Sequence, residues 1–224
     1  EGYLNYKESF GDHDLDVMGG YSWQHFEEGS ESRDDDSAGT NVAKPSNINK
    51  AELYMLSLFG RVNYTFQNRY LLTGSLRRDG TSRFAPEYRW GIFPAAAFAV
   101  KLIEKDRKYL NNLKIRTSWG LTGNQDIKIR DENNYYAYLP QYQFGDQSAQ
   151  YQLGDSFYTT IRPNGYVRDI KWEETSSFNA GLDFSIVNGR LSGSFDVYQR
   201  STKDLLNYIS PAALSNLTNY VYDN

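Results

Sequence analysis

The stretch SLFGRVNYTFQNRYLLTGSLR, residues 57–77, decides the fold. Apolar or small residues occupy every second position from Leu58 to Phe66 and again from Tyr70 to Leu76, on either side of Gln67-Asn68-Arg69. Because a strand turns successive side chains to opposite faces, each half has one apolar face and one polar face. The stretch therefore predicts two antiparallel strands joined by a three-residue turn.

The same alternation recurs along the chain and predicts eight strands, at about 3–10, 14–26, 57–66, 70–77, 92–102, 113–121, 178–186 and 191–197. Their connections are short and long in turn. Asn188-Gly189 is the strongest turn signal, because both residues tolerate positive φ, whereas residues 27–51 and 122–173 are long and polar. Short turns at one end and long loops at the other are typical of outer-membrane β-barrels, so we expect an all-β, antiparallel transmembrane barrel segment.

The amino-acid composition excludes several classes of protein. Aromatic residues make up 16% of the 224 residues, with 19 Tyr, which fits a barrel wall and also a secreted sugar-binding β-sandwich. Cysteine is absent, which excludes thiolate metal sites and disulfides. No run of about 18 apolar residues exists, which excludes a transmembrane helix but not barrel strands. The net charge of −4 and the interspersed charges speak against nucleic-acid binding.

Catalytic and metal-binding patterns are weak. The only two histidines, His13 and His25, are expected in a turn and near a strand end, as surface or girdle residues, and no nucleophile elbow or phosphate-binding glycine loop is present. Residues 34–41 contain oxygen ligands for calcium, but the spacing is not that of an EF-hand, and a solvated acidic loop is the commoner structure. We expect no enzyme activity, no cofactor and no metal site. Residues 78–80 and 123–125 are interpreted as turn chemistry.

The long connection 122–173 is the candidate ligand-binding segment. Its aromatic side chains alternate with amides and carboxylates, a combination that gives flat apolar platforms and hydrogen-bonding groups for sugar rings or peptide side chains. The alternative is that these rings pack against one another or against a partner. The candidate residues are Tyr135, Tyr136, Tyr138, Tyr142, Phe144, Tyr151, Phe157 and Tyr158.

Several blocks of the sequence resemble one known family. In order along the chain they are FGRVNY (59–64), RYLL (69–72), LRRDGTSRF (76–84), RWGIFP (89–94), LKIRTSWG (113–120), LTGNQ (121–125), KWEET (171–175), GLDF (181–184) and TKDLL (202–206). Together they are similar to the barrel of SusC/RagA transporters, which are TonB-linked outer-membrane proteins of Bacteroidota.

This resemblance implies a barrel of about 22 strands around a plug, to which residues 1–224 contribute about eight strands from the middle and later part. The plug and the closing strands have no counterpart here, so we expect the chain to be a partial barrel. It also implies import of an oligosaccharide or peptide through the outer membrane, driven by the TonB complex through the plug region and capped by a SusD-like surface lipoprotein. A passive porin-like barrel and a secreted β-sandwich carbohydrate-binding module are the alternatives.

Overall fold

The structure is a computed structural model. It describes residues 1–32, 47–103, 110–129, 132–133, 135–145, 148, 150–163, 165–209 and 221–223. Within that part of the chain every regular element is a strand, and no helix is long and apolar enough to cross a membrane.

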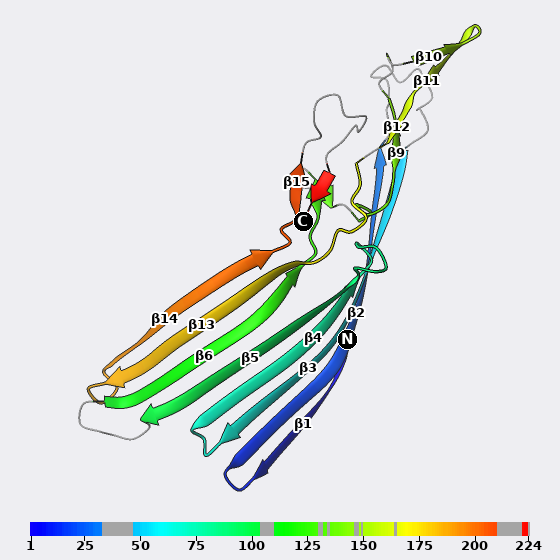
Figure 1. Ribbon diagram of the computed structural model, residues 1–224. Coiled ribbons are helices and arrows are strands. Elements are labelled where there is room, and N and C mark those ends of the chain that lie inside the picture. The colour runs from blue at the N-terminus through cyan, green and yellow to red at the C-terminus, as the bar shows by residue number, and fades with distance from the viewer. Residues whose placement is uncertain are drawn as a thin grey trace, which may run out of the picture.

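Eight long strands form one antiparallel sheet in the order β1-β2-β3-β4-β5-β6-β13-β14 (Figure 1). Each strand pairs with its neighbour in this order, so β13 follows β6 in space although a long segment separates them in sequence. A single sheet excludes the two-layered sandwich alternative. Their bounds are β1 Gly2–Phe10, β2 His13–Ser32, β3 Asn47–Phe66, β4 Tyr70–Thr81, β5 Trp90–Ile103, β6 Leu110–Asn124, β13 Glu173–Ile186 and β14 Leu191–Lys203.

The connections divide between the two ends of the sheet as the sequence predicts (Figure 1). The lower end has the turns at 11–12, 67–69 and 187–190, and the upper end has the connections at 82–89 and 125–172. The last of these turns is wider than expected. Positive φ begins at Val187, with 54°, and continues through Asn188 and Gly189, so the turn spans four residues rather than the Asn-Gly pair alone.

Short two-stranded pairs occupy the upper end. Four of them are present: β7 Lys128–Ile129 with β8 Glu132–Asn133, β9 Tyr142–Phe144 with β12 Ile161–Pro163, β10 Gln150–Leu153 with β11 Ser156–Thr159, and β15 Asn207–Ile209 with β16 Val221–Asp223. Strands β2 and β3 are also longer than expected, because they remain paired up to Ser32 and Asn47. Residues 34–37 and 41, the calcium candidates, lie outside the described residues.

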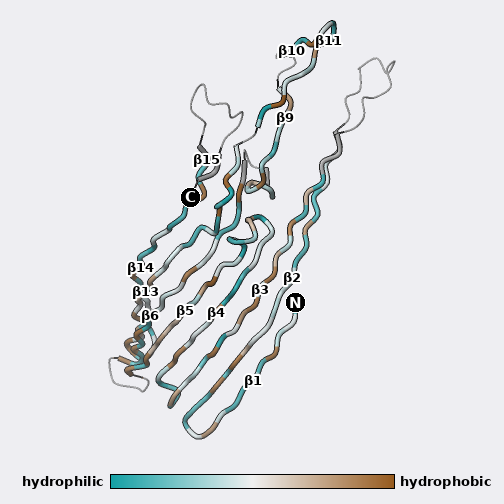
Figure 2. Tube along the Cα trace, turned by 45° about the vertical axis from the view of Figure 1, so that its right-hand side comes forward, coloured by the Kyte–Doolittle hydropathy of each residue, from teal (hydrophilic) through white to brown (hydrophobic). Residues whose placement is uncertain are grey.

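The register gives the sheet two chemically different faces. One row across the strands contains Val62, Gly74, Ala96, Trp119 and Phe178, and the adjacent row on the opposite face contains Asn63, Thr73, Ala97, Ser118 and Asn179. We call these the outer and inner faces. The predicted division is confirmed for the charged residues, since Arg61, Arg77, Lys114, Arg116 and Asp183 all lie on the inner face, and apolar and polar residues alternate along the strands (Figure 2).

Aromatic side chains border the outer face at both ends. The lower group contains Phe10, His13, Tyr64, Phe66 and Tyr70, and the upper group contains Tyr21, Trp23, Tyr54, Trp90 and Trp119. His13 and Trp23 lie ten residues apart on β2, which is about 33 Å along a strand at about 3.3 Å per residue. A tilt of about 40° reduces this to about 25 Å along the membrane normal, the height of the apolar band of an outer-membrane barrel.

A charge on the outer face should therefore impair insertion into a bilayer. We expect Val62→Arg or Leu182→Arg in the full-length barrel to destabilise the inserted state by about 2–4 kcal/mol, as a mid-depth charge does on a lipid-facing strand. Equilibrium unfolding from lipid vesicles in urea measures this difference. The matched control is Asn63→Arg, one residue along β3 on the inner face. Equal losses for Val62→Arg and Asn63→Arg would contradict this assignment of faces.

Candidate functional site at the rim of the sheet

Among the described residues, a cluster of buried apolar side chains lies at the upper end of the sheet. We call this cluster the rim core. It joins the connection after β4, strand β5, the segment after β6 and the segment before β13. Its members are Phe84, Phe93, Ile127, Ala137, Ile170 and Trp172, with Leu121, Tyr138, Val167 and Leu206 packed against it. Leu121 thus joins the core, although the alternation in the sequence predicts that it continues the apolar face of the strand.

Trp172 is the centre of the rim core. Its ring meets Phe84 and Phe93 edge-on at centroid distances of 5.6 and 5.3 Å, and its Nε1 donates to the Arg89 carbonyl at 3.0 Å. Edge-to-face pairs contribute about 0.5–1.5 kcal/mol each beyond the area they bury. The indole therefore joins the segment before β13 to the connection between β4 and β5, through its ring contacts and its hydrogen bond.

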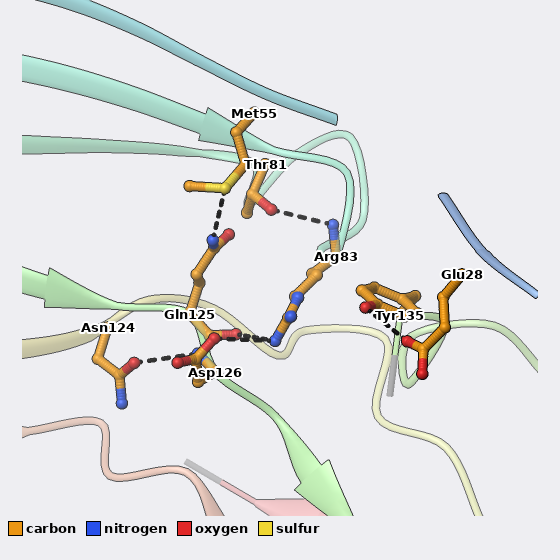
Figure 3. Close-up of polar contacts among 8 residues, drawn as sticks. All are labelled: Glu28, Met55, Thr81, Arg83, Asn124, Gln125, Asp126 and Tyr135. Atoms are coloured by element: carbon orange, nitrogen blue, oxygen red, sulfur yellow. Dashed lines mark hydrogen bonds and ion pairs between the residues drawn. The ribbon is translucent and has the colours of Figure 1, made fainter. Parts of the chain in front are cut away.

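Arg83 lies beside the rim core with only 4% of its side chain exposed (Figure 3). Its Nη1 donates to the Gln125 carbonyl at 3.3 Å and to Asp126 Oδ1 at 3.2 Å, and the guanidinium lies 5.0 Å from the centre of the Tyr135 ring. Asp126 is 58% exposed, so its ion pair is screened by water and contributes little. The carbonyl and the ring are the contacts that hold the start of the long connection.

The structure divides the eight predicted site residues into two groups. Tyr135, Tyr136 and Tyr138 belong to the anchor. Tyr135 donates from its hydroxyl to Glu28 Oε2 at 2.9 Å (Figure 3), the Tyr136 hydroxyl accepts from the Glu52 backbone N–H at 3.1 Å, and Tyr138 packs on the rim core. Tyr135 and Tyr136 therefore attach the long connection to β2 and β3, and Tyr138 attaches it to the rim core.

The other five predicted residues are exposed. They lie on the two small hairpins β9–β12 and β10–β11 at the upper end, where β10–β11 extends beyond the ends of β2 and β3 (Figure 1). Phe144 is the most exposed, at 75%, and Tyr151 and Tyr158 face each other across β10 and β11. These five rings are free to meet a ligand or a partner: Tyr142, Phe144, Tyr151, Phe157 and Tyr158.

A pocket of about 510 Å³ lies on the inner face directly below the rim core. Arg77 and Asp79 line it, with Arg77 Nε bound to both oxygens of Asp79 at 2.7 and 2.8 Å. Gln125 also lines it. Its Nε2 donates to Met55 Sδ at 3.1 Å, and its buried Oε1 has no partner among the described residues. The pocket thus combines an ion pair with an acceptor that remains available.

The strand bounds show that the interpretation of residues 78–80 and 123–125 as turns is wrong. The former lie inside β4, and Gly123 and Asn124 end β6, so none of these five residues is in a turn. Gly91 and Gly123 are small for a different reason: a Cβ on either would overlap the Phe93 ring. Glycines adjacent to a bulky aromatic in the quoted sequence blocks were the available signal for the rim core.

The histidines are far apart, as expected. His13 belongs to the lower aromatic group, where its Nδ1 lies 2.6 Å from the Tyr64 hydroxyl, and His25 stacks on Tyr54 near the upper end.

An ion pair between Glu87 and Arg168, at 3.3 Å, also joins two segments at the rim. A hydrogen bond from its own backbone lowers the pKa of the Glu87 carboxyl, and Arg168 lowers it further.

Comparison with known proteins agrees with this geometry. Residues 1–224 match the family described as TonB dependent receptor-like, beta-barrel. The chain belongs to this family. It is 41% identical over 217 residues to the TonB-dependent receptor SusC of Bacteroides thetaiotaomicron, covering 92% of this chain and 21% of that receptor. It is 32% identical to a TonB-dependent receptor of Formosa agariphila, covering 92% and 21%.

Solved structures show the same sheet. The RagAB peptide transporter matches 99% of this TonB-dependent receptor chain with a TM-score of 0.79 and 25% identity, and the match covers 25% of the transporter chain. The chain therefore spans about a quarter or less of the proteins it resembles. As part of this family of receptors it lies in the outer membrane, and in the described residues its eight-stranded sheet is open, with β1 and β14 at the two edges.

We expect Arg83→Met to loosen the start of the long connection. The change removes the hydrogen bond from the charged guanidinium to the Gln125 carbonyl and the contact with the Tyr135 ring. A hydrogen bond with one charged partner contributes about 1.5–3 kcal/mol. Amide hydrogen exchange in the full-length receptor should accelerate roughly thirtyfold around Ile127 and Tyr135, which corresponds to about 2 kcal/mol of local opening. The control Asp126→Asn removes only the exposed partner and should change exchange less than threefold. Equal effects would assign the anchoring to the ion pair instead.

The tight packing at Phe93 gives a second test. Gly123→Ala should destabilise the rim by about 1–3 kcal/mol, because the added methyl overlaps the Phe93 ring. Gly74→Ala is the matched control, since a methyl on that strand glycine meets nothing within 4 Å. Thermal denaturation of both variants measures the difference. The added change Phe93→Leu should restore part of the loss in Gly123→Ala, and a failure to do so would rule out this overlap as the cause.

Proposed function

We propose that the chain forms part of the wall and the extracellular rim of an outer-membrane importer for glycans or peptides. The proposal rests on one observation: the long connection has a part that is anchored to the rest of the chain and a part whose aromatic rings are exposed. Tyr135 and Tyr136 bind Glu28 and the Glu52 N–H near the upper ends of β2 and β3, Tyr138 packs on the rim core, and five aromatic rings beyond this anchor are exposed at the upper end. An anchored segment with free rings presents a binding surface at a fixed place over the barrel.

The chemistry of that surface suits the proposed cargo. Aromatic faces bind the apolar faces of sugar rings and the side chains of peptides, and amides beside them bind hydroxyl or backbone groups. Gln143 and Gln152 alternate with the exposed rings along the two hairpins. Below them, the inner-face pocket with Arg77, Asp79 and Gln125 offers polar contacts on the way into the lumen.

The relatives supply the partners of the proposal. The family name implies coupling to TonB, which would act on a plug region outside this chain, and the SusC relationship supports pairing with a SusD-like surface lipoprotein over the rim. The RagAB relative is described as a peptide transporter, which keeps peptide beside glycan as a cargo. The proposal assigns binding and passage to the chain and no catalytic step. A passive porin would not need the TonB coupling that the family name specifies.

Removing only the exposed part of the segment tests the proposal. We expect deletion of residues 150–159 in the full-length receptor to lower uptake at least fivefold in intact cells, because three of the five free rings are lost. The barrel should still assemble, since the anchor through Tyr135 and Tyr136 is left in place. The matched control is Tyr64→Phe, which changes a ring at the opposite end of the sheet and should leave uptake unchanged.

An epitope placed at Gly154, the tip of the β10–β11 hairpin, tests the side of the membrane. It should bind antibody on intact cells. Staining that requires permeabilised cells would place the upper end in the periplasm and reverse the proposed topology. Wild-type uptake after the deletion, with normal surface expression, would remove the hairpin from transport.

A further inference from the structure

Beyond the sheet, β2 and β3 continue upward as a two-stranded ribbon. The last pair between β3 and β4 joins Met55 to Thr81, whereas the pairing of β2 with β3 runs on to Ser32 and Asn47. We call residues 25–32 and 47–54 the β2–β3 ribbon. A two-stranded ribbon is only marginally stable in water without further contacts. It has such contacts, because Glu28 on its inner face binds Tyr135 and the Glu52 backbone N–H, which lies in the plane of the strands, binds Tyr136.

The outer side of the ribbon carries three metal-ligating side chains. Glu27 and Glu52 are directly opposite each other, and His25 lies two residues before Glu27 on the same face. His25 Nε2 is 3.6 Å from Glu52 Oε2, and one ligand atom from each of the three residues lies within 4.8 Å of the other two. Each side chain remains partly open to solvent, so an ion can reach the site.

Two of these ligands are already oriented by neighbours. The His25 ring stacks on Tyr54 at a centroid distance of 4.3 Å with 5° between the planes, and the Tyr54 hydroxyl donates to Glu52 Oε2 at 2.8 Å. Hydrogen bonds and packing of this kind fix the direction of metal ligands in known sites. A cation binding here would therefore need little rearrangement of His25 or Glu52.

The site already attracts a positive charge. The Lys50 ammonium lies 2.7 Å from Glu27 Oε1 and 3.6 Å from Glu52 Oε1, and so bridges the two carboxylates. Two carboxylates and one ammonium leave one negative charge uncompensated. This arrangement shows that the carboxylates converge on a common cation, and that a second cation of higher charge would compete with Lys50.

We propose that His25, Glu27 and Glu52 form a binding site for a divalent cation of the zinc class. Zinc is bound by imidazole nitrogen and carboxylate oxygen at about 2.0–2.2 Å, so two ligands of a tetrahedral ion lie about 3.4 Å apart. The 3.6 Å between His25 and Glu52 fits this spacing, and rotation of the Glu27 side chain brings in the third ligand. Calcium and magnesium prefer oxygen ligands alone, so the imidazole selects against them.

Three protein ligands leave a fourth position for water or an external oxygen. The ion would cross-link β2 to β3 above the last pair with β4. Because the Glu52 backbone also binds Tyr136, the ion on the outer side and the tyrosine anchor would hold the same part of the ribbon. The inference does not depend on the cargo of the importer.

The test uses the purified full-length receptor in detergent, with zinc ion alone as the probe. We expect calorimetric titration to give a site that is weakened at least tenfold by His25→Ala and by Glu52→Gln. Lys50→Met should strengthen it, because the competing ammonium is gone. Glu8→Gln is the matched control, since Glu8 is an exposed carboxylate on the same face that also accepts from a tyrosine two residues away. It should leave the affinity unchanged.

Copper(II) bound in place of zinc reports directly on its ligands, so its spectrum distinguishes the loss of a ligand from a general loss of structure. Electron paramagnetic resonance should show coupling to one imidazole nitrogen that disappears in His25→Ala, while heat-modifiable mobility on gels confirms that the variant is folded. Equal zinc affinity in the wild type, His25→Ala and Glu52→Gln would overturn the proposal. So would an equal loss in Glu8→Gln, which would mean that any surface carboxylate suffices.

Discussion

In the hydrocarbon of a membrane, every backbone N–H and C=O must find its partner inside the protein, and this requirement organises the whole sheet. The antiparallel ladder from β1 to β14 meets it between the strands, and the side chains are left to separate into an outer and an inner face. Arg116 shows the consequence on the inner face. Its guanidinium reaches Asp183 at 3.2 Å and Asp196 at 2.7 Å, crossing β13 where Gly181 has no side chain. A Cβ there would lie 2.6 Å from the Arg116 Cζ.

At the upper end the hydrogen bonds between strands stop, and side chains donate hydrogen bonds to backbone carbonyls instead. Arg89 Nε donates to the Phe84 carbonyl, Trp172 Nε1 to the Arg89 carbonyl, and Arg83 to the Gln125 carbonyl. The first of these bonds closes the connection 82–89 on itself, and the other two join that connection to the segments before β13 and after β6. The rim core therefore holds the upper end of the sheet together through side chains from β5 and from the connections beside it.

The alternation of apolar and polar residues was enough to predict the eight strands, their order and their faces, because a two-residue period is imposed by the backbone itself. It could not predict the β2–β3 ribbon. Glu27, Glu28 and Gly29 have the composition of a loop, yet they pair with Glu52, Ala51 and Lys50, since cross-strand charges and tyrosine contacts stabilise them in place of apolar burial. Nor could composition separate Tyr135, which lies under Arg83, from Tyr151, which is exposed. That distinction depends on contacts between segments more than fifty residues apart.

Glu52 connects the parts of the rim that the sequence leaves separate. Its carboxylate faces His25 and Lys50 on the outer side of the ribbon, while its backbone N–H binds the Tyr136 hydroxyl. A change in the charge around that carboxylate acts on the same residue that holds the long connection. Glu52 therefore joins the β2–β3 ribbon to the anchor of the long connection, and the exposed hairpins lie beyond that anchor along the chain.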